Sequence, residues 1–170
     1  MGLNDRWCLI HCTQMTPPET IALARTGAVA GLCPITESSL GDGIFDGVRW
    51  LDHDGAIAIG SDSNIRISLS EELRTLDYSQ RLRDGTRAAL ATPEFSTGRR
   101  LFDGALAGGA QATQRKSGQI ASGYWADMLA LDMTSEHMWG RADDTALDSW
   151  IFAGDDRLVT DVWSPGRHMV

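Results

Sequence analysis

The first 60 residues contain three short runs of consecutive apolar positions, at residues 7–12, 28–34 and 56–60. A run that is apolar at successive positions is typical of a strand buried on both faces, because alternate side chains of a strand point to opposite sides. Stretches with helix signals separate the runs. Buried strands that alternate with helices predict a parallel sheet covered by helices, which is an α/β fold.

Capping signals place a helix between the first two runs. Thr16 followed three residues later by Glu19 is a capping-box pattern, in which the two residues bind backbone N–H groups that the first turn leaves free. Gly27 predicts the end of this helix, because glycine readily adopts the left-handed conformation that often follows a helix. A Gly-rich loop at residues 41–43 and a short amphipathic stretch at 44–51 come before the third run.

Two longer helices are predicted after the third run. The first begins at Ser68 or Ser70, and Ser68 with Glu71 is a second capping-box pattern. Its apolar positions are Leu73, Leu76 and Leu82. The second helix covers about residues 97–112, and the pair Gly108-Gly109 within it predicts close packing against a neighbouring element.

The pattern changes after Lys116. The remaining segment has three short apolar runs joined by Gly- and Asp-rich turns, at residues 126–132, 150–153 and 157–163. Short strands joined by tight turns are typical of antiparallel structure. We therefore predict a domain boundary near Lys116, between an α/β unit of residues 1–116 and a β-rich unit of residues 117–170.

Composition and charge narrow the classes of partner. The 170-residue chain has a formal net charge of −8 and a sequence pI of about 4.8, so it offers no basic stripe for a nucleic-acid backbone. No apolar run is long enough to predict a membrane span, and the first residues lack the apolar core of an export signal. The chain has too few cysteines for a disulfide framework, namely Cys8, Cys12 and Cys33. We expect these cysteines to be free and to pack as small hydrophobic side chains, and the protein to reside in the reducing cytoplasm.

Polar residues follow each of the three predicted strands: His11, then Thr36-Glu37, then Asp62. Because ligand sites of α/β sheets lie at the carboxyl ends of the strands, these residues are expected to share one site. A histidine and a carboxylate at two strand ends suit a mononuclear zinc hydrolase, in which the carboxylate moves a proton. Structural alternatives stay open: His11 packs as a hydrogen-bonded residue, and Ser61–Asn64 forms an Asx turn that caps a helix.

Five segments carry a family resemblance, in order and over essentially the whole chain: residues 9–13, 31–37 with 40–43, 59–64, 101–109 and 118–132. The first three resemble strands six, seven and eight of the (β/α)8 TIM barrel of the amidohydrolase superfamily. The fourth resembles the helix after strand eight, and the fifth the return into that superfamily's small β-sandwich domain. The phrases at 33–37 and 61–68 most resemble the formimidoylglutamate deiminases. The resemblance implies the C-terminal part of a barrel followed by part of a β-sandwich.

The resemblance also implies a zinc-dependent hydrolase of a C–N bond, which converts N-formimidoyl-L-glutamate to N-formyl-L-glutamate and ammonia in histidine degradation. It implies that Asp62 is the strand-eight metal ligand and proton shuttle. It implies that His11 is the strand-six histidine, which contacts the substrate and polarises its formimino carbon. The complete enzyme is expected to form a homo-oligomer. The roles of Glu37, Asn64 and Arg66 stay open; Arg66 either neutralises a substrate carboxylate or forms a structural ion pair.

The sequence lacks counterparts of several residues that the resemblance implies. These are the paired metal-binding histidines after strand one, the histidine of strand five and the acid–base glutamate. His53, His137 and His168 do not fit those places and are expected to be surface histidines. The zinc site is therefore incomplete, and we expect the chain to be a fragment that is inactive alone.

Two alternatives differ from this interpretation. One is another aminohydrolase of the same superfamily, for purines or triazines, or an imidazolonepropionase. The other is a non-catalytic α/β fragment without metal. As part of a barrel, the strand at 7–12 is expected to lack its fifth-strand neighbour and the strand at 56–60 the first strand that would close the ring, which predicts association with other chains.

Overall fold

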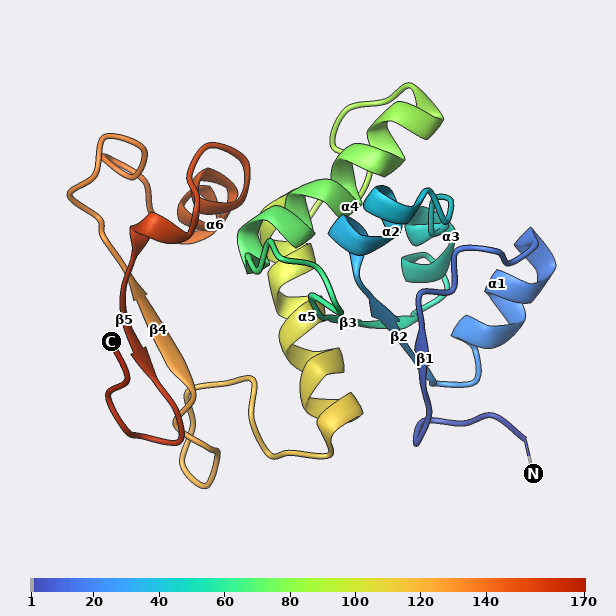
Figure 1. Ribbon diagram of the computed structural model, residues 1–170, viewed down its shortest axis with the longest axis horizontal. Helices are drawn as coiled ribbons and strands as arrows, with labels where there is room; N and C mark the ends of the chain where they lie inside the picture. The colour runs from blue at the N-terminus through green and yellow to red at the C-terminus, as the bar shows by residue number, and fades with distance from the viewer. Residues whose placement is uncertain (1) are drawn as a thin grey trace.

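A computed structural model describes residues 2–170, which form one parallel and one antiparallel sheet (Figure 1). The parallel sheet consists of β1 (Cys8–Ile10), β2 (Val29–Leu32) and β3 (Ala56–Ile59), in the order β1-β2-β3. The α/β class with a parallel sheet, predicted from the three apolar runs, is confirmed. Since all three strands point the same way, their carboxyl ends lie at one edge of the sheet.

Five helices accompany this sheet: α1 (Pro17–Ala24), α2 (Pro34–Leu40), α3 (Gly47–Leu51), α4 (Leu69–Asp84) and α5 (Thr97–Thr113). The longest, α5, packs along β3, and α4 lies beside α2 and α3 (Figure 1). In the part of the chain that is described, no helix combines the length and the apolar character needed to cross a bilayer.

The predicted capping residues begin their helices. The backbone N–H and the hydroxyl of Thr16 both donate to the Glu19 carboxylate, at 2.8 and 2.7 Å. Ser68 is the N-cap of α4 and accepts the Glu71 N–H at 3.3 Å, while Ser70 lies inside the helix. Of the two starts left open for this helix, Ser68 is therefore the one that the structure adopts.

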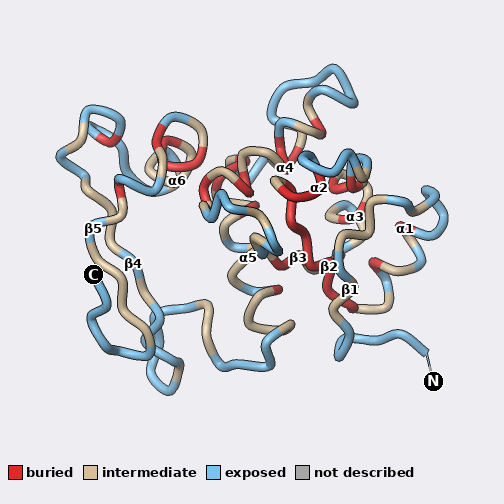
Figure 2. The backbone as a smooth tube through the Cα atoms, in the orientation of Figure 1, coloured by how far each residue is buried: buried red, intermediate tan, exposed pale blue. Residues whose placement is uncertain are grey.

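The hydrophobic core combines residues of the sheet and of its helices with residues of the C-terminal segment, among them Trp150, Ile151 and Leu158 (Figure 2). All four residues of β2 are buried, as expected for a central strand apolar on both faces. Leu73 and Leu76 of α4 are buried in this core, and so is Leu101 of α5. Leu82 is 85% exposed and contributes nothing to the core, because it lies on the solvent face near the end of α4.

The strand predicted at residues 150–153 is wrong, because Trp150, Ile151 and Phe152 belong to the helix α6 (Asp143–Phe152). The Thr145 side chain accepts the Ala142 N–H at 3.0 Å and so caps the first turn, where two aspartates also favour a helix N-terminus. The apolar positions repeat at helical spacing when 146, 147, 150 and 151 are taken together.

Two strand ends also differ from the prediction. The second run ends as a strand at Leu32, and Pro34 begins α2, since proline suits a first helical turn that needs no N–H. Glu37 consequently lies in a helix and not in the predicted loop. The first run ends as a strand at Ile10, so that His11 follows the strand directly.

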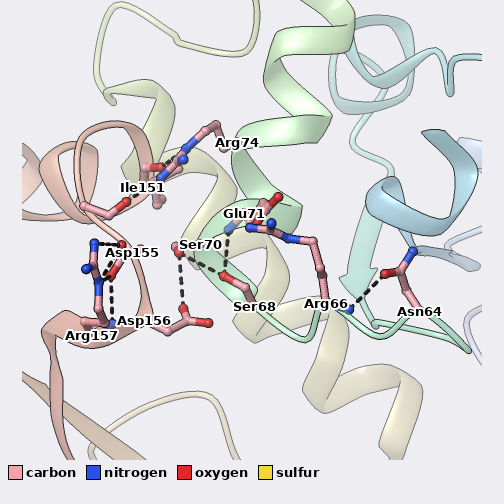
Figure 3. Close-up of polar contacts among 11 residues, drawn as sticks. Asn64, Arg66, Ser68, Ser70, Glu71, Arg74, Ile151, Asp155, Asp156 and Arg157 are labelled. Atoms are coloured by element: carbon pink, nitrogen blue, oxygen red, sulfur yellow. Dashed lines mark hydrogen bonds and ion pairs between the residues drawn. The ribbon is translucent and has the colours of Figure 1, made fainter. Parts of the chain in front are cut away.

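The C-terminal segment pairs β4 (Met128–Leu131) with β5 (Val159–Trp163), which confirms the predicted antiparallel structure. A short 3₁₀ turn, Asp156–Leu158, precedes β5. This segment is anchored to the rest, because the Arg74 guanidinium donates to the carbonyls of Ile151 and Gly154, both at 2.6 Å (Figure 3). The domain boundary near Lys116 and the partial β-sandwich stay predictions.

Glu72 of α4 makes stability depend on pH. Its side chain is buried, Oε2 accepts the Ile35 N–H at 2.8 Å, and Oε1 has no partner within residues 2–170. Burial, which disfavours the charged form, raises the pKa of Glu72 from its ordinary value of 4.5 to about 7. As pH rises from 4.5 to about 7, the unfolded chain releases this proton and the folded chain retains it, so the free energy of unfolding falls.

We expect Glu72→Gln to remove this loss and to stabilise the chain above neutral pH. The gain relative to wild type is about 2–4 kcal/mol near pH 8 and close to zero near pH 4, from ~1.4 kcal/mol per pKa unit. Urea unfolding of both proteins across that pH range measures it. The exposed Glu94→Gln is the control. A difference between Glu72→Gln and wild type that does not grow with pH would contradict the prediction.

The outer edge of β1 predicts self-association. No strand among residues 2–170 pairs with that edge, and Ile10 at its end is 58% exposed. Unpaired apolar strand edges are templates for pairing with other chains. We expect the purified 170-residue chain to associate as its concentration rises, and Ile10→Lys to shift it toward monomer.

Size-exclusion chromatography with light scattering measures this association. Ile65→Lys is the matched control, because Ile65 is 97% exposed but lies in the loop after β3, away from any strand edge. A wild-type chain that stays monomeric at every concentration, with one cooperative melting transition, would refute the expectation.

Candidate functional site

Three potential metal-ligating side chains follow the three parallel strands in turn. His11 comes directly after β1, Cys33 directly after β2, and Asp62 three residues after β3. Their nearest ligand atoms, one from each side chain, all lie within 4.8 Å of one another. The expectation that His11 and Asp62 share one edge of the sheet is met, while Cys33 was expected only as a small hydrophobic side chain.

The imidazole of His11 lies between two carboxylates. Its Nε2 is 3.8 Å from Asp62 Oδ2, and its Nδ1 is 3.2 Å from Glu37 Oε1. His11 and Asp62 are partly exposed, whereas Glu37 is buried. The ring therefore reaches from a buried carboxylate toward an accessible one.

Glu37 fixes the orientation of the His11 ring. Its Oε1 also accepts the backbone N–H of Cys33 at 2.8 Å, so the carboxylate is held at the first turn of α2. Burial raises the pKa of Glu37, and the hydrogen bonds from Cys33 and His11 counteract that effect. We assign a proton to Nδ1, because the Glu37 carboxylate that it faces accepts; Nε2 faces Asp62.

The backbone is strained at this edge of the sheet. His11 has φ of 70°, Cys12 has φ of 52° and Asp62 has φ of 51°, all in the left-handed region. This region costs a β-carbon-bearing residue about 1–3 kcal/mol, and such positions gather at functional sites. These strained residues lie directly after β1 and near the start of the loop after β3.

Two of the cysteines near the site have thiols that resist ionisation. Burial is the main cause that raises the pKa of Cys33 to about 11, and the charges of Glu37, Asp62 and Glu72 add to it. Burial likewise raises the pKa of Cys12 to about 11. All three cysteines are free. At neutral pH these thiols are therefore protonated unless a cation displaces the proton.

The loop after β3 contains the two other polar residues left open by the sequence. Figure 3 shows that Arg66 extends toward Glu71, with Nε 3.0 Å from Glu71 Oε2 and Nη2 also in contact. Asn64 accepts the backbone N–H of Arg66 at 2.9 Å. Arg66 therefore forms the structural ion pair that was one of its two alternatives, and Asn64 stabilises the loop.

The remaining histidines lie away from this cluster. His53 is half-buried, with Nδ1 2.9 Å from the Arg49 carbonyl oxygen in the turn after α3. His137 and His168 are exposed in the C-terminal segment, and His168 contacts Asp161. Two cavities of about 260 and 300 Å³ also lie outside the cluster, since none of its three ligands lines either one.

Comparison with known proteins identifies the family. The family model described as Amidohydrolase family matches residues 2–169. The chain belongs to the amidohydrolase family. The formimidoylglutamate deiminase of Pseudomonas aeruginosa is 47% identical over 171 residues, a match that covers 100% of this chain and 38% of that protein. The 5-methylthioadenosine/S-adenosylhomocysteine deaminase of Pyrococcus abyssi is 27% identical over 141 residues, or 80% of this chain and 31% of that protein.

Solved structures of amidohydrolases show the same fold. An amidohydrolase from Brucella melitensis superposes with a TM-score of 0.91 at 44% identity, over 100% of this chain and 37% of that one. An adenosine deaminase from Xanthomonas campestris, solved with bound zinc, superposes with a TM-score of 0.84 at 26% identity, over 98% and 37%. The amidohydrolase resemblance seen in the sequence is confirmed. The chain spans less than two fifths of the length of each of these proteins.

The donor set fits a divalent transition metal. Zinc binds imidazole nitrogen, thiolate sulfur and carboxylate oxygen, and a four-coordinate zinc places neighbouring ligand atoms about 3.3–3.7 Å apart. The separation of 3.8 Å between His11 Nε2 and Asp62 Oδ2 is close to that value. It is too long for a hydrogen bond, which for these atoms falls near 2.7–3.2 Å.

Proposed function

We propose that this chain is part of a zinc-dependent deiminase that hydrolyses the formimino C–N bond of N-formimidoyl-L-glutamate, giving N-formyl-L-glutamate and ammonia. The observation that carries the proposal is the pairing of His11 Nε2 with Asp62 Oδ2 at 3.8 Å across the carboxyl ends of β1 and β3. The 47% identity to the formimidoylglutamate deiminase of Pseudomonas aeruginosa supports the choice of substrate.

Each residue has a proposed role in this reaction. A zinc ion bound at Asp62 would supply the Lewis acidity that activates water. Asp62 would move both protons of the water to the formimino nitrogen, the first as the water oxygen bonds to the formimino carbon and the second as the C–N bond breaks and ammonia leaves. His11 directs Nε2 toward the formimino carbon and nitrogen, while its Nδ1–H donates to Glu37. Glu37 keeps this nitrogen protonated and so maintains the tautomer that the reaction uses.

The proposal extends to the architecture. We propose that β1, β2 and β3 are strands six to eight of a (β/α)8 barrel, that residues 1–116 belong to the barrel and that residues 117–170 belong to a β-sandwich. The remaining zinc ligands would come from histidines after strands one and five, which this sequence does not supply. We further propose a small-molecule substrate, a homo-oligomeric complete enzyme and a cytoplasmic location.

A chimera tests the proposal. It is the Pseudomonas aeruginosa deiminase with the segment that aligns to this chain replaced by the 170 residues. We expect the chimera to release ammonia from N-formimidoyl-L-glutamate with zinc bound, and the 170-residue chain alone to release none above the blank. A zinc-loaded, folded chimera without activity would overturn the proposed function.

The alternative substrates are separated by the same assay. The adenosine-type deaminases among the relatives are 22–31% identical to this chain, below the 47% of the formimidoylglutamate deiminase. The chimera is therefore assayed with adenosine and S-adenosylhomocysteine alongside N-formimidoyl-L-glutamate. Deamination of a purine nucleoside in preference to the formimino substrate would favour the alternative.

A further inference from the structure

We propose that His11, Cys33 and Asp62 of the 170-residue chain bind one divalent transition-metal ion by themselves, with Cys33 as its thiolate ligand. The inference shares Asp62 with the proposed function and adds a ligand set that this function does not use. In the proposed deiminase, the other ligands would be histidines that this sequence does not supply, and His11 would contact the substrate. In the 170-residue chain, the nearest available donors to Asp62 are His11 and Cys33.

The first argument is the convergence of three ligand atoms from three different strand ends. With Nδ1 donating to Glu37, the Nε2 of His11 faces Asp62 Oδ2 at 3.8 Å without a hydrogen bond. Cys33 Sγ completes a triangle whose atoms all lie within 4.8 Å. Three donors that converge in this way, without hydrogen bonds to one another, match three corners of a coordination shell.

The second argument is the support behind the ligands. Metal-binding histidines usually donate their other N–H to a carboxylate, which fixes the ring and makes the ligating nitrogen more basic. Glu37 makes this contact with His11 at 3.2 Å and also accepts the N–H of Cys33 at 2.8 Å. One buried carboxylate thus holds two of the three proposed ligands.

The third argument is charge. The Asp62 and Glu37 carboxylates lie near Cys33, and no Lys or Arg among residues 2–170 forms an ion pair with either of them. This negative charge attracts a cation to the cluster. When the ion binds, the thiol proton goes to solvent and the sulfur–metal bond takes its place. Sulfur and imidazole ligands favour Zn²⁺ and Co²⁺ over Mg²⁺ and Ca²⁺.

Cobalt is the probe for the test, because Co²⁺ replaces Zn²⁺ and absorbs light. We expect titration of the 170-residue chain with Co²⁺ to give a near-ultraviolet thiolate-to-cobalt charge-transfer band that saturates at one ion per chain and disappears on adding Zn²⁺. Cys33→Ala and Cys33→Ser should abolish the band. The matched control is Cys12→Ala, which removes a free thiol next to His11 and should keep it.

Two further measurements keep the test independent of any folding defect in a variant. X-ray absorption of the zinc-loaded wild-type chain should show one sulfur neighbour at about 2.3 Å. Glu37→Gln, checked for folding by circular dichroism, should weaken cobalt binding about tenfold or more, because the His11 ring loses its anionic acceptor.

The inference is overturned if the wild-type chain binds no Co²⁺, if it binds Co²⁺ without the charge-transfer band, or if Cys33→Ala retains the band. Cobalt binding that depends on Asp62 but lacks sulfur would reject Cys33 as a ligand and leave the proposed function standing. A sulfur-ligated cobalt site together with an inactive, folded, zinc-loaded chimera would support the inference and reject the proposed function.

Discussion

Replacing Asp62 with asparagine in the chimera is expected to lower kcat by about 10³-fold while leaving the fold intact. The proposed Asp62 both binds the ion and transfers a proton, and acid–base work alone contributes about 10²–10⁴-fold. Asparagine keeps the size of the side chain and tolerates the left-handed backbone that Asp62 adopts at φ of 51°. Steady-state ammonia release and zinc content, measured on the same sample, give the two readouts.

Asp54→Asn is the control for this substitution. Asp54 is also exposed, precedes β3 and has φ of 59°, but it lies outside the donor cluster. Its replacement should leave kcat unchanged. His11→Ala in the same chimera should lower kcat by about 10²-fold and retain zinc, since the proposed function makes His11 a substrate contact and not a zinc ligand. Equal loss of zinc from the Asp62 and His11 variants would contradict the separate roles proposed for them.

The parallel sheet could be predicted from the sequence, because its strands are buried on both faces and read as unbroken apolar runs. The placement of His11 and Asp62 at one edge followed from this, since parallel strands end together. The helix α6 could not be read correctly from its last residues alone. Trp150-Ile151-Phe152 has strand-like composition, and only the positions at 146 and 147 reveal the helical spacing.

The contacts inside the site depend on where α2 begins. Because the helix starts at Pro34, the first turn brings Glu37 back over the N–H of Cys33 and beside His11. A strand continuing through Pro34 would have directed Glu37 elsewhere. Cys33 was missed because apolar neighbours made it look like a small core residue. The available signal was its position relative to the strand, since both His11 and Cys33 directly follow the last residue of a strand.

Gly108→Ala is expected to destabilise the 170-residue chain by about 3 kcal/mol or more, at the high end of what overpacking a core costs. A β-carbon at Gly108 would lie 1.9 Å from the carbonyl oxygen of Ile57 and 2.6 Å from its carbonyl carbon. These are backbone atoms of β3, which no rotamer change can move aside. The helix α5 would have to shift away from the strand that leads to Asp62.

Gly109→Ala is the matched control one position along the same helix. A β-carbon there has no atom within 4 Å, and alanine favours a helix by up to about 1 kcal/mol over glycine, so stability should stay level or rise. Of the two glycines predicted to allow close packing, only Gly108 lies against a strand. Urea unfolding followed by circular dichroism, at a concentration where the chain is monomeric, measures both variants. Equal stability of Gly108→Ala and Gly109→Ala would show that α5 does not depend on this backbone contact with β3.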